Sequence, residues 1–300
     1  MILPDRAQHP GDVADHYDEL DPIYRAIWGE NVHHGLWRTG RESPTEAVEA
    51  LSDHVGALLG LGDDTPPRKL IDIGCGYGAT ARRFAARHGA SVTGYTLSSE
   101  QAGHGGASPG IDIHVGDWLH NDLPDGIADG AYAIESSEHM ADKAGFFAQA
   151  FRVLKPGGRL VVCVWLADED AGPWAIRHLL EPICREGRLA SMGTRGEYEL
   201  WARQAGFTLL SYEDVSRQVR RTWTICAGRF TRRLLIDPAY MRLVASPRTR
   251  NRIFLLSLPR LVLAYRTGAM HYGVFAFGKP VQGMIALGSG RGPTASNRAI

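Results

Sequence analysis

The stretch Leu70-Ile71-Asp72-Ile73-Gly74-Cys75-Gly76-Tyr77-Gly78-Ala79-Thr80 decides the fold of this chain. Apolar and β-branched residues that end abruptly at a glycine predict a buried strand that runs into a tight turn. The residues that follow keep Phe84 and Ala85 apolar among arginines, which predicts an amphipathic helix. Glycine is needed where the backbone adopts a positive φ or approaches a ligand closely, and a helix start presents free N–H groups. The stretch therefore predicts a strand, a glycine turn and a helix, with a candidate ligand site at the turn.

The glycine turn has more than one interpretation. Gly74-x-Gly76-x-x-Ala79 formally fits the dinucleotide-binding pattern G-x-G-x-x-G/A, which calls for an acidic residue about 20 residues further on to bind a ribose hydroxyl. Here the second predicted strand ends at Thr96, and the nearby Glu100 falls inside the next predicted helix. The acidic residue is instead Asp72, where a carboxylate could organise the turn and interact with a cationic ligand. A plain turn in which Asp72 bonds only its own loop is the third interpretation.

The rest of the chain alternates strands and helices. Strands are expected at residues 69–73, 91–95, 111–115, 130–134 and 159–165, with helix-length segments between them, and further strands at 207–215 and 271–279. This alternation predicts an α/β fold, a Rossmann-like doubly wound sheet of seven mostly parallel strands. In such sheets the ligand lies beyond the carboxyl ends of the strands. The segments that follow those ends are Asp72–Gly78, Thr96–Gln101, Asp117–Trp118 and Glu135–His139.

Blocks within these segments resemble class I S-adenosylmethionine (SAM) methyltransferases. Asp72-x-Gly74-x-Gly76-x-Gly78 is similar to the first motif of that family. The blocks that follow it in the family's order are Val92–Ser98, Gly116-Asp117-Trp118, Glu135-Ser136-Ser137-Glu138-His139-Met140 and Leu154-Lys155-Pro156-Gly157-Gly158. The variant Thr-Leu-Ser at 96–98 and the Glu-x-x-Glu-His-Met block point to the branch of tocopherol, sterol and natural-product methyltransferases. The resemblance covers about residues 15–280 and departs at Thr96, where many class I enzymes carry a ribose-binding acid.

The resemblance implies SAM as cofactor and S-adenosylhomocysteine as product. The residues expected to bind SAM are Asp72, Gly74, Cys75, Gly76, Gly78, Thr96, Leu97, Gln101, Asp117, Trp118, Glu135 and Tyr17. Gln101 is expected to make the polar contact that the missing acid would make. Trp118 covers an adenine face or packs in the core, and Asp117 accepts the adenine amino group or closes a turn.

Residues 15–37 gather aromatic side chains and adjacent histidines, and a helix followed by a loop at residues 33–35 is expected there. This segment is an aromatic strap packed on the core or, as the resemblance implies, a cover over SAM and the acceptor. In the second case the candidate acceptor-binding residues are His33, His34, Trp37, Trp174 and Trp223. A metal site at the two histidines is not favoured, because neighbouring side chains in a loop rarely converge and no carboxylate or cysteine cluster lies beside them.

The domain organisation follows from the same pass along the chain. Ser43-Pro44 opens a helix that runs to about Leu59. Beyond Trp165 the pattern becomes irregular, with helices expected at 174–190 and 198–206, and residues 217–266 rich in arginine. That basic segment is a lid or a solvated face. The expected units are a flexible N-terminus 1–14, a helical strap 15–62, a core 63–280 with lid insertions at about 168–195 and 216–268, and a flexible tail 281–300.

Composition narrows the class of protein. Lysine and arginine total 33 and so do aspartate and glutamate, so no global field favours nucleic acid or an anionic membrane. The four cysteines form no C-x-x-C pair, which favours reduced thiols in the cytoplasm. The N-terminus lacks a basic region followed by an apolar run, so no secretory signal is expected. No run of apolar residues is long enough to span a membrane. A monomer or homodimer is expected.

Methyl transfer from a sulfonium is an in-line displacement that mainly needs position and exclusion of water. A phenol with a pKa near ~10 is a weak nucleophile, so a general base helps. His139 is the first candidate, because histidine titrates near neutrality. Glu138 would orient His139, bind an acceptor amine, or remove a proton after attack by an alkene carbon. The sequence thus predicts a SAM-dependent methyltransferase of a hydrophobic or aromatic metabolite, natural-product or isoprenoid/quinone-like, with O-methylation favoured over C- or N-methylation. The alternatives are an NAD(P)-dependent oxidoreductase and a non-catalytic SAM-binding protein.

Overall fold

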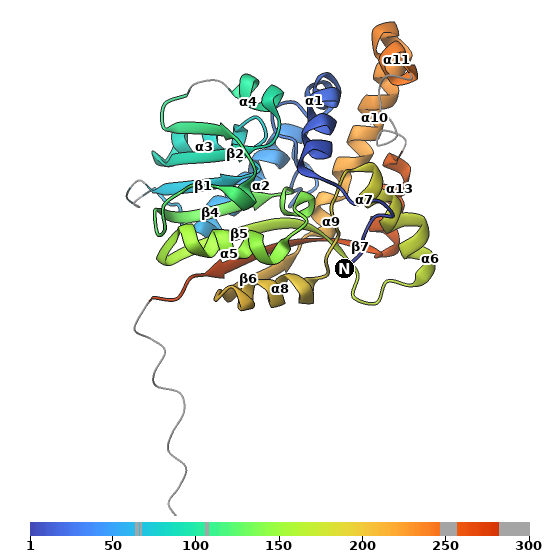
Figure 1. Ribbon diagram of the computed structural model, residues 1–300. Helices are drawn as coiled ribbons and strands as arrows, with labels where there is room; N and C mark the ends of the chain where they lie inside the picture. Colours follow the sequence, from blue (N-terminus) through green and yellow to red (C-terminus); the bar gives the residue numbers. More distant parts are fainter. Residues whose placement is uncertain (64–65, 67, 106–107, 247–256, 282–300) are drawn as a thin grey trace, which may run out of the picture.

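The computed structural model describes residues 1–63, 66, 68–105, 108–246 and 257–281. Its centre is a seven-stranded sheet in the order β3-β2-β1-β4-β5-β7-β6 (Figure 1). The strands are β1 (Lys69–Ile73), β2 (Ser91–Thr96), β3 (Ile111–Val115), β4 (Ala128–Ile134), β5 (Leu154–Ala167), β6 (Thr208–Asp214) and β7 (Met270–Gly278). The first five strands pair in parallel, and β7 runs antiparallel to both β5 and β6. The predicted Rossmann-like, mostly parallel sheet is confirmed.

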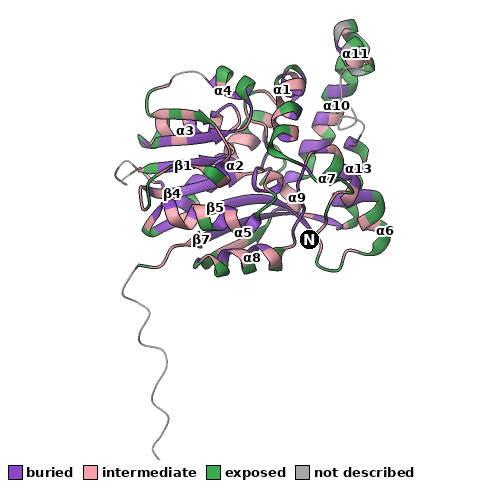
Figure 2. Ribbon diagram, viewed as in Figure 1, coloured by how far each residue is buried: buried purple, intermediate pink, exposed green. Residues whose placement is uncertain are grey.

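Two hydrophobic cores cover the two faces of the sheet. Alternate residues of each strand point to opposite faces, so Leu70 enters one core while Ile71 and Ile73 enter the other. Helices α2 (Pro44–Leu59) and α3 (Ala79–His88) pack in the first core, whereas α5 (Lys143–Val153) and α8 (Arg195–Gln204) pack in the second. Figure 2 shows the central strands buried between these helical layers.

The sheet departs from the sequence-based expectation mainly at β5, which begins at Leu154 rather than at residue 159. Leu154 pairs with Ala128 of β4 ahead of a register shift, and the pairing resumes at Gly130 with Arg159. Residues 154–158 therefore belong to the strand, although its pairing with β4 is irregular there. Because such a bulge depends on the partner strand, the hydrophobic run at 159–165 does not reveal it.

The first helix begins earlier in the chain than expected. Helix α1 spans Pro10–Ile27, and Ile2 forms an isolated β-bridge with Met192, so residues 1–14 are not the loose segment that their polar composition suggests. Proline at the first helical position and the capping interactions of His9 and Asp12 start the helix. The expected tail lies outside the described residues apart from Val281.

The two expected insertions contain short helices. The first carries α6 (Pro173–Ala175), a π-helical turn (Ile176–Leu180) and α7 (Glu181–Glu186), in place of one helix over 174–190. The second carries α9 (Ser216–Val219), α10 (Arg221–Ile236), α11 (Pro238–Ala245) and α13 (Leu258–Thr267). Figure 1 shows α10 and α11 standing out from the body, with α11 furthest from the sheet. Among the helices of the described residues, none combines the length and apolar composition needed to cross a bilayer.

Candidate functional site

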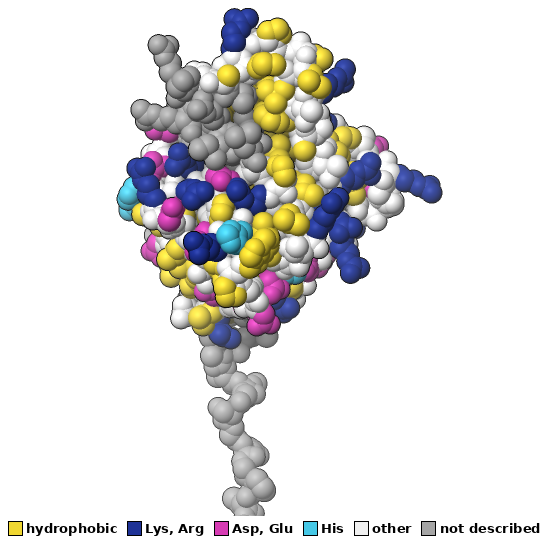
Figure 3. All heavy atoms as spheres, turned by 90° about the vertical axis from the view of Figure 1, so that its right-hand side faces the viewer, with side chains coloured by type: hydrophobic (Ala, Val, Ile, Leu, Met, Phe, Trp, Pro, Cys, Tyr) yellow, Lys and Arg dark blue, Asp and Glu magenta, His cyan; other side chains and the backbone are white. Residues whose placement is uncertain are grey.

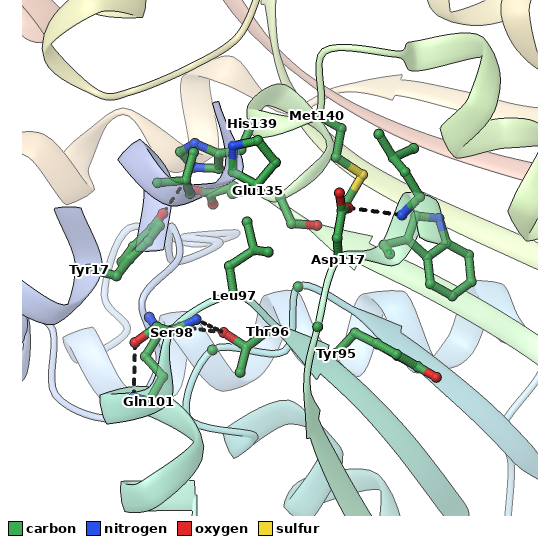
Figure 4. A pocket seen from close by; sticks show the side chains of 18 of the residues that line it. Tyr17, Tyr95, Thr96, Leu97, Ser98, Gln101, Asp117, Glu135, His139 and Met140 are labelled. Atoms are coloured by element: carbon green, nitrogen blue, oxygen red, sulfur yellow. Dashed lines mark hydrogen bonds between the residues drawn. The ribbon is translucent and has the colours of Figure 1, made fainter. Parts of the chain in front are cut away.

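A cavity of about 260 Å³ lies at the carboxyl ends of the parallel strands (Figure 4). Its walls come from the segments that follow β1, β2, β3 and β4, together with α1 and the residues before it. The lining includes Gln8, Val13, Tyr17, Gly74, Gly76, Thr96, Leu97, Gln101, Asp117, Trp118, Glu135, Ser136, His139 and Met140. The sequence blocks that follow separate strands thus meet around one space, as the topology of a parallel sheet requires.

The glycine turn after β1 has room for no side chain at two of its glycines. A Cβ at Gly74 would lie 2.2 Å from the Cβ of Ser136, and one at Gly78 would lie 2.8 Å from Ile113 Cδ1. Gly74, Gly76 and Gly78 all adopt positive φ. The amide of Cys75 donates to the Tyr95 carbonyl at 2.8 Å, which ties the turn to β2. The backbone can therefore approach a ligand closely at Gly74 and Gly76, while Gly78 begins α3 behind them.

Asp72 lies behind the turn, buried, and lines a second, smaller cavity of about 40 Å³ with Cys75 and Gly76. Burial raises the pKa of the Asp72 carboxyl to about 7, although the Tyr132 hydroxyl donates to it at 2.9 Å and opposes the rise. A carboxylate in this setting is stabilised by a cation bound at the turn, because few groups of the protein compensate its charge.

The segment after β2 forms a compact set of hydrogen bonds. The Thr96 hydroxyl donates to the Gln101 carbonyl oxygen at 2.8 Å and accepts the amide of Ser98 at 3.2 Å. With its oxygen engaged, Gln101 directs its amide nitrogen toward Gly76, 3.9 Å from where a Cβ would stand. Thr96 thus positions Gln101, and the amide of Gln101 faces the cavity beside the glycine turn (Figure 4).

The segment after β3 contributes Asp117 and Trp118. The Asp117 carboxylate accepts the amide of Leu119 at 3.0 Å and so begins a 3₁₀ turn, as well as lining the cavity. Trp118 is buried edge-on against Tyr95 and donates to the Phe146 carbonyl at 3.4 Å. The turn interpretation of Asp117 and the core interpretation of Trp118 are therefore observed, and both residues also line the cavity, so their contacts with adenine stay predictions.

Glu135 lies at the junction of two cavities, but its carboxylate is occupied by protein groups. It accepts hydrogen bonds from the His34 amide and ring, the Tyr272 hydroxyl and the Trp165 indole, at 2.7–3.1 Å. Burial raises the pKa of Glu135, but the adjacent His34 imidazole outweighs it and holds that pKa at about 2. Its φ of 55° is unusual for a residue other than glycine. The observed role of Glu135 is to fix the strap to the sheet.

His139 projects into the same cavity with a defined tautomer. Its Nδ1 lies 3.0 Å from the carbonyl oxygen of Arg188, which can only accept, so Nδ1 carries the proton. Its Nε2 lies 3.0 Å from the Tyr17 hydroxyl and therefore accepts from that phenol. Burial lowers the pKa of His139 to about 4, so the imidazole is neutral near pH 7. Its Nε2 therefore faces the cavity through one phenol (Figure 4), but the buried ring is a weaker base than the near-neutral histidine expected from the sequence.

A smaller cavity of about 40 Å³ adjoins the first and shares Tyr17, Glu135 and His139 with it. Its remaining walls are mostly aromatic: Tyr24, Trp28, Trp165, Trp223, Glu138 and Leu189. Glu138 accepts the amide of Trp165 at 2.8 Å, and burial raises its pKa to about 7. A larger, mostly apolar space beside the glycine turn thus adjoins a small aromatic space beyond His139.

Several residues expected at the acceptor site lie elsewhere. Trp174 is 60% exposed beside His178, because the buried face of its segment is formed by the later leucines 179 and 180. Trp37 donates to the Glu42 carbonyl and lines a separate cavity of about 200 Å³, together with His33. His34 is buried behind Glu135 among four aromatic rings and lines none of the described cavities. Of that set, Trp223 alone reaches the aromatic cavity.

Sequence reasoning missed four residues that line the aromatic cavity. Tyr24 and Trp28 belong to the aromatic segment of α1 and the turn after it. Because this segment contains several aromatic residues, the sequence did not indicate which of them line the cavity. Trp165 lies near the carboxyl end of β5, so the rule that placed the other strand ends at the site would also have found it. Leu189 follows α7, and no local pattern marks it.

Comparisons with known proteins agree with this geometry. A family model described as a methyltransferase domain matches residues 42–212. The 27-O-demethylrifamycin SV methyltransferase of Amycolatopsis mediterranei is 33% identical over 74% of this chain and 82% of its own length. The chloroplastic tocopherol O-methyltransferase of Arabidopsis thaliana is 26% identical over 90% of this chain and 82% of its own. Among solved structures, the cyclopropane synthase MmaA2 of Mycobacterium tuberculosis has a TM-score of 0.78 at 25% identity, covering 92% of this chain and 100% of that one.

Proposed function

The chain belongs to the methyltransferase domain family and is a SAM-dependent methyltransferase, and we propose that it methylates an oxygen atom of a hydrophobic or aromatic small metabolite. Membership of this family removes the oxidoreductase alternative. The names of the relatives support oxygen as the acceptor atom and a natural product or a quinone-like molecule as the substrate. The observation that carries the proposal is the neutral His139 at the junction of the two cavities.

The larger cavity fits SAM. Its apolar walls, Leu97, Met140 and Trp118, suit an adenine ring, and the Asp117 carboxylate would accept from the adenine amino group. The glycine turn offers backbone groups to the amino-acid end, with Asp72 behind it to balance a cation. SAM supplies a methyl group on a sulfonium. The chain's part is to hold that group, exclude water and receive the acceptor's proton.

We propose that the acceptor binds at the aromatic cavity, whose volume of about 40 Å³ has to widen to admit a ring. Tyr17, His139 and the indoles of Trp28 and Trp223 would enclose a flat or apolar group there. His139 Nε2 would take the proton of the acceptor hydroxyl, directly or through the Tyr17 phenol that it now binds. Leu189 and Trp223 come from the two expected lid insertions, which supports our proposal that both cover the acceptor.

The test begins with calorimetry of SAM binding to the purified chain, which is expected to give a saturable site. The chain is then incubated with SAM and a panel of phenols and hydroquinones, and S-adenosylhomocysteine is quantified. Product should form only with acceptors that carry a free hydroxyl, and mass spectrometry should place the methyl group on oxygen. A folded chain that binds SAM but turns over no acceptor would support a non-catalytic role instead.

C-methylation is the second candidate. It is supported by Glu138, whose pKa is raised by burial to about 7 and which faces a cavity walled by indoles and phenols. Aromatic faces stabilise a developing cation, and a carboxylate could remove the final proton. A product with the methyl group on carbon would favour this assignment. The free cysteines support our proposal that the enzyme works in the cytoplasm, and a monomer or homodimer stays a prediction.

A further inference from the structure

One segment concentrates positive charge in a chain that is otherwise balanced. Residues 216–267 contain twelve arginines and a single acidic residue, Asp237, an excess of eleven positive charges. The whole chain has 33 basic and 33 acidic residues. The segment that contains α10, α11 and α13 is therefore net basic, while the rest of the chain is net acidic.

The same segment exposes large apolar side chains at its outer end. Leu235 is 79% exposed and Ile236 62% exposed at the end of α10, and Met241 on α11 is 52% exposed. Arg232 and Arg242, both exposed, lie within one helical turn of these residues. We call this group of three apolar and two basic residues the α10–α11 tip. In Figure 1 it stands away from the sheet.

One face of α10 is buried in the body. Thr222, Trp223, Cys226 and Phe230 are all buried, and Trp223 lines the aromatic cavity. Twelve residues separate Trp223 from Leu235, a distance of roughly 18 Å along an α-helix. One rigid helix thus connects the acceptor cavity to the exposed tip, which lies on the side shown in Figure 3, where hydrophobic side chains form a run with basic side chains at its margins.

The exposed arginines and apolar side chains of the tip together favour one kind of binding partner. Nucleic acid would use the arginines but offers nothing to Leu235 and Ile236. A basic helix with exposed leucine, isoleucine or methionine at one end suits an anionic lipid bilayer, where arginines meet the headgroups and apolar side chains enter the acyl boundary. We propose that the α10–α11 tip docks the protein on an anionic membrane surface. The proposal does not depend on which acceptor is methylated, because lipid binding is measured without methyl transfer.

The test uses the full chain and extruded vesicles, either of phosphatidylcholine alone or of phosphatidylcholine and phosphatidylglycerol in equal parts. Vesicle-bound protein is measured by sedimentation over a series of salt concentrations. We expect binding to the anionic vesicles only, weakening as salt rises because screening shortens the range of the arginine charges.

Two double variants separate the charge from the apolar contact. Arg232→Gln with Arg242→Gln, and Leu235→Asn with Ile236→Asn, are each expected to weaken binding to anionic vesicles by roughly tenfold or more. Arg203→Gln with Leu210→Asn is the matched control, since both residues are exposed on α8 and β6 at the opposite end of the molecule. All variants should retain SAM affinity by calorimetry, because none of these side chains lines the SAM cavity.

The remaining outcomes overturn the proposal. Absence of binding to anionic vesicles does so directly, as does binding that both tip variants leave unchanged. Weakening by the arginine pair alone, with full binding by the leucine–isoleucine pair, would show a purely electrostatic surface. That result would indicate that the α10–α11 tip binds an acidic soluble protein rather than a bilayer.

Discussion

His139 is the residue whose role the structure defines most narrowly. The Arg188 carbonyl fixes the proton on Nδ1, and burial keeps the ring neutral, so Nε2 is unprotonated and accepts a hydrogen bond from the Tyr17 hydroxyl, although the lowered pKa makes it a weaker base than an exposed histidine. We predict that His139→Ala lowers kcat by about 10²–10⁴-fold with an acceptor hydroxyl, because a general base contributes that much. The dissociation constant of SAM should change little. Steady-state kinetics and calorimetry make the two measurements.

His178→Ala is the control for that variant, since His178 is exposed beside Trp174 and distant from both cavities. It should leave kcat unchanged. A wild-type kcat in His139→Ala would show that His139 is a structural residue. Glu138, which also lines the aromatic cavity and whose pKa burial raises to about 7, would then be the next candidate base.

Loss of the Asp72 charge is expected to have opposite effects on the stability of the apo protein and on SAM binding. Burial raises its pKa to about 7 in the folded protein, so the folded state binds more protons than the unfolded chain between about pH 4 and pH 7. Stability from this group is therefore lost as the pH rises through that interval. Asp72→Asn is expected to raise the apo melting temperature at pH 8 by ~5 °C, with little effect near pH 4, and to weaken SAM binding.

Melting curves at the two pH values and SAM calorimetry test this pair of effects. The Tyr132 hydroxyl can still donate to the new amide oxygen, so the local hydrogen bond is retained. A variant with wild-type SAM affinity would show that Asp72 only organises the loop, the plain-turn interpretation of the sequence. A melting temperature that falls equally at both pH values would contradict the linkage argument.

At the scale of elements, His271 at the start of β7 joins the points where both insertions begin. It lies 2.9 Å from Asp214 at the end of β6 and 3.0 Å from Asp168 just after β5. The hydrogen bonds that the His271 ring donates to Asp214 and Asp168 raise the pKa of His271 to about 9. A raised histidine pKa stabilises the fold fully below the unfolded value of about 6.5, and this stabilisation is lost as the pH rises toward 9.

We therefore predict that His271→Gln lowers the melting temperature by about 2–4 °C at pH 6, with a difference from wild type that shrinks above pH 9. Differential scanning calorimetry over this range measures it. His178→Gln should show no such pH-dependent difference, because His178 is not held between carboxylates. A deficit in His271→Gln that stays constant from pH 6 to pH 10 would mean that packing, and not charge, accounts for the effect.

The same elements show what the sequence could predict. The strand and glycine turn at 69–78 were predictable because their signals are local: a β-branched run, then glycines in positive φ. The convergence of the strand ends followed from topology alone. The register shift that lengthens β5, the π-helical turn after Pro173 and the outward Trp174 depend on partners distant in sequence, so no local pattern marks them. His34 was predicted to bind the acceptor, but in the structure it pairs with Glu135. That contact joins residues distant in sequence, so no local pattern indicated it.

At the scale of the whole molecule, α1 connects the N-terminus to the cofactor side of the sheet. Tyr17 contacts His139, Asp18 accepts from the Ser98 hydroxyl, and Asp21 accepts from the Tyr77 hydroxyl at 2.5 Å. One helix therefore bonds to the segments after β1, β2 and β4. Because α1 also forms a wall of the larger cavity, an opening of α1 would remove part of the SAM site.

This coupling predicts that SAM protects α1 from amide hydrogen exchange. A ligand that binds only the closed form slows exchange by up to 1 + [L]/Kd, which is about a hundredfold at a ligand concentration of 100 Kd. Amides of residues 10–27 should approach that factor, whereas amides of α8 should not change, because α8 packs on the other core, away from the cavity. Mass-spectrometric exchange with and without S-adenosylhomocysteine makes the comparison. Equal protection of α1 and α8 would indicate a global stabilisation, and unprotected α1 would mean that the helix does not close over the cofactor.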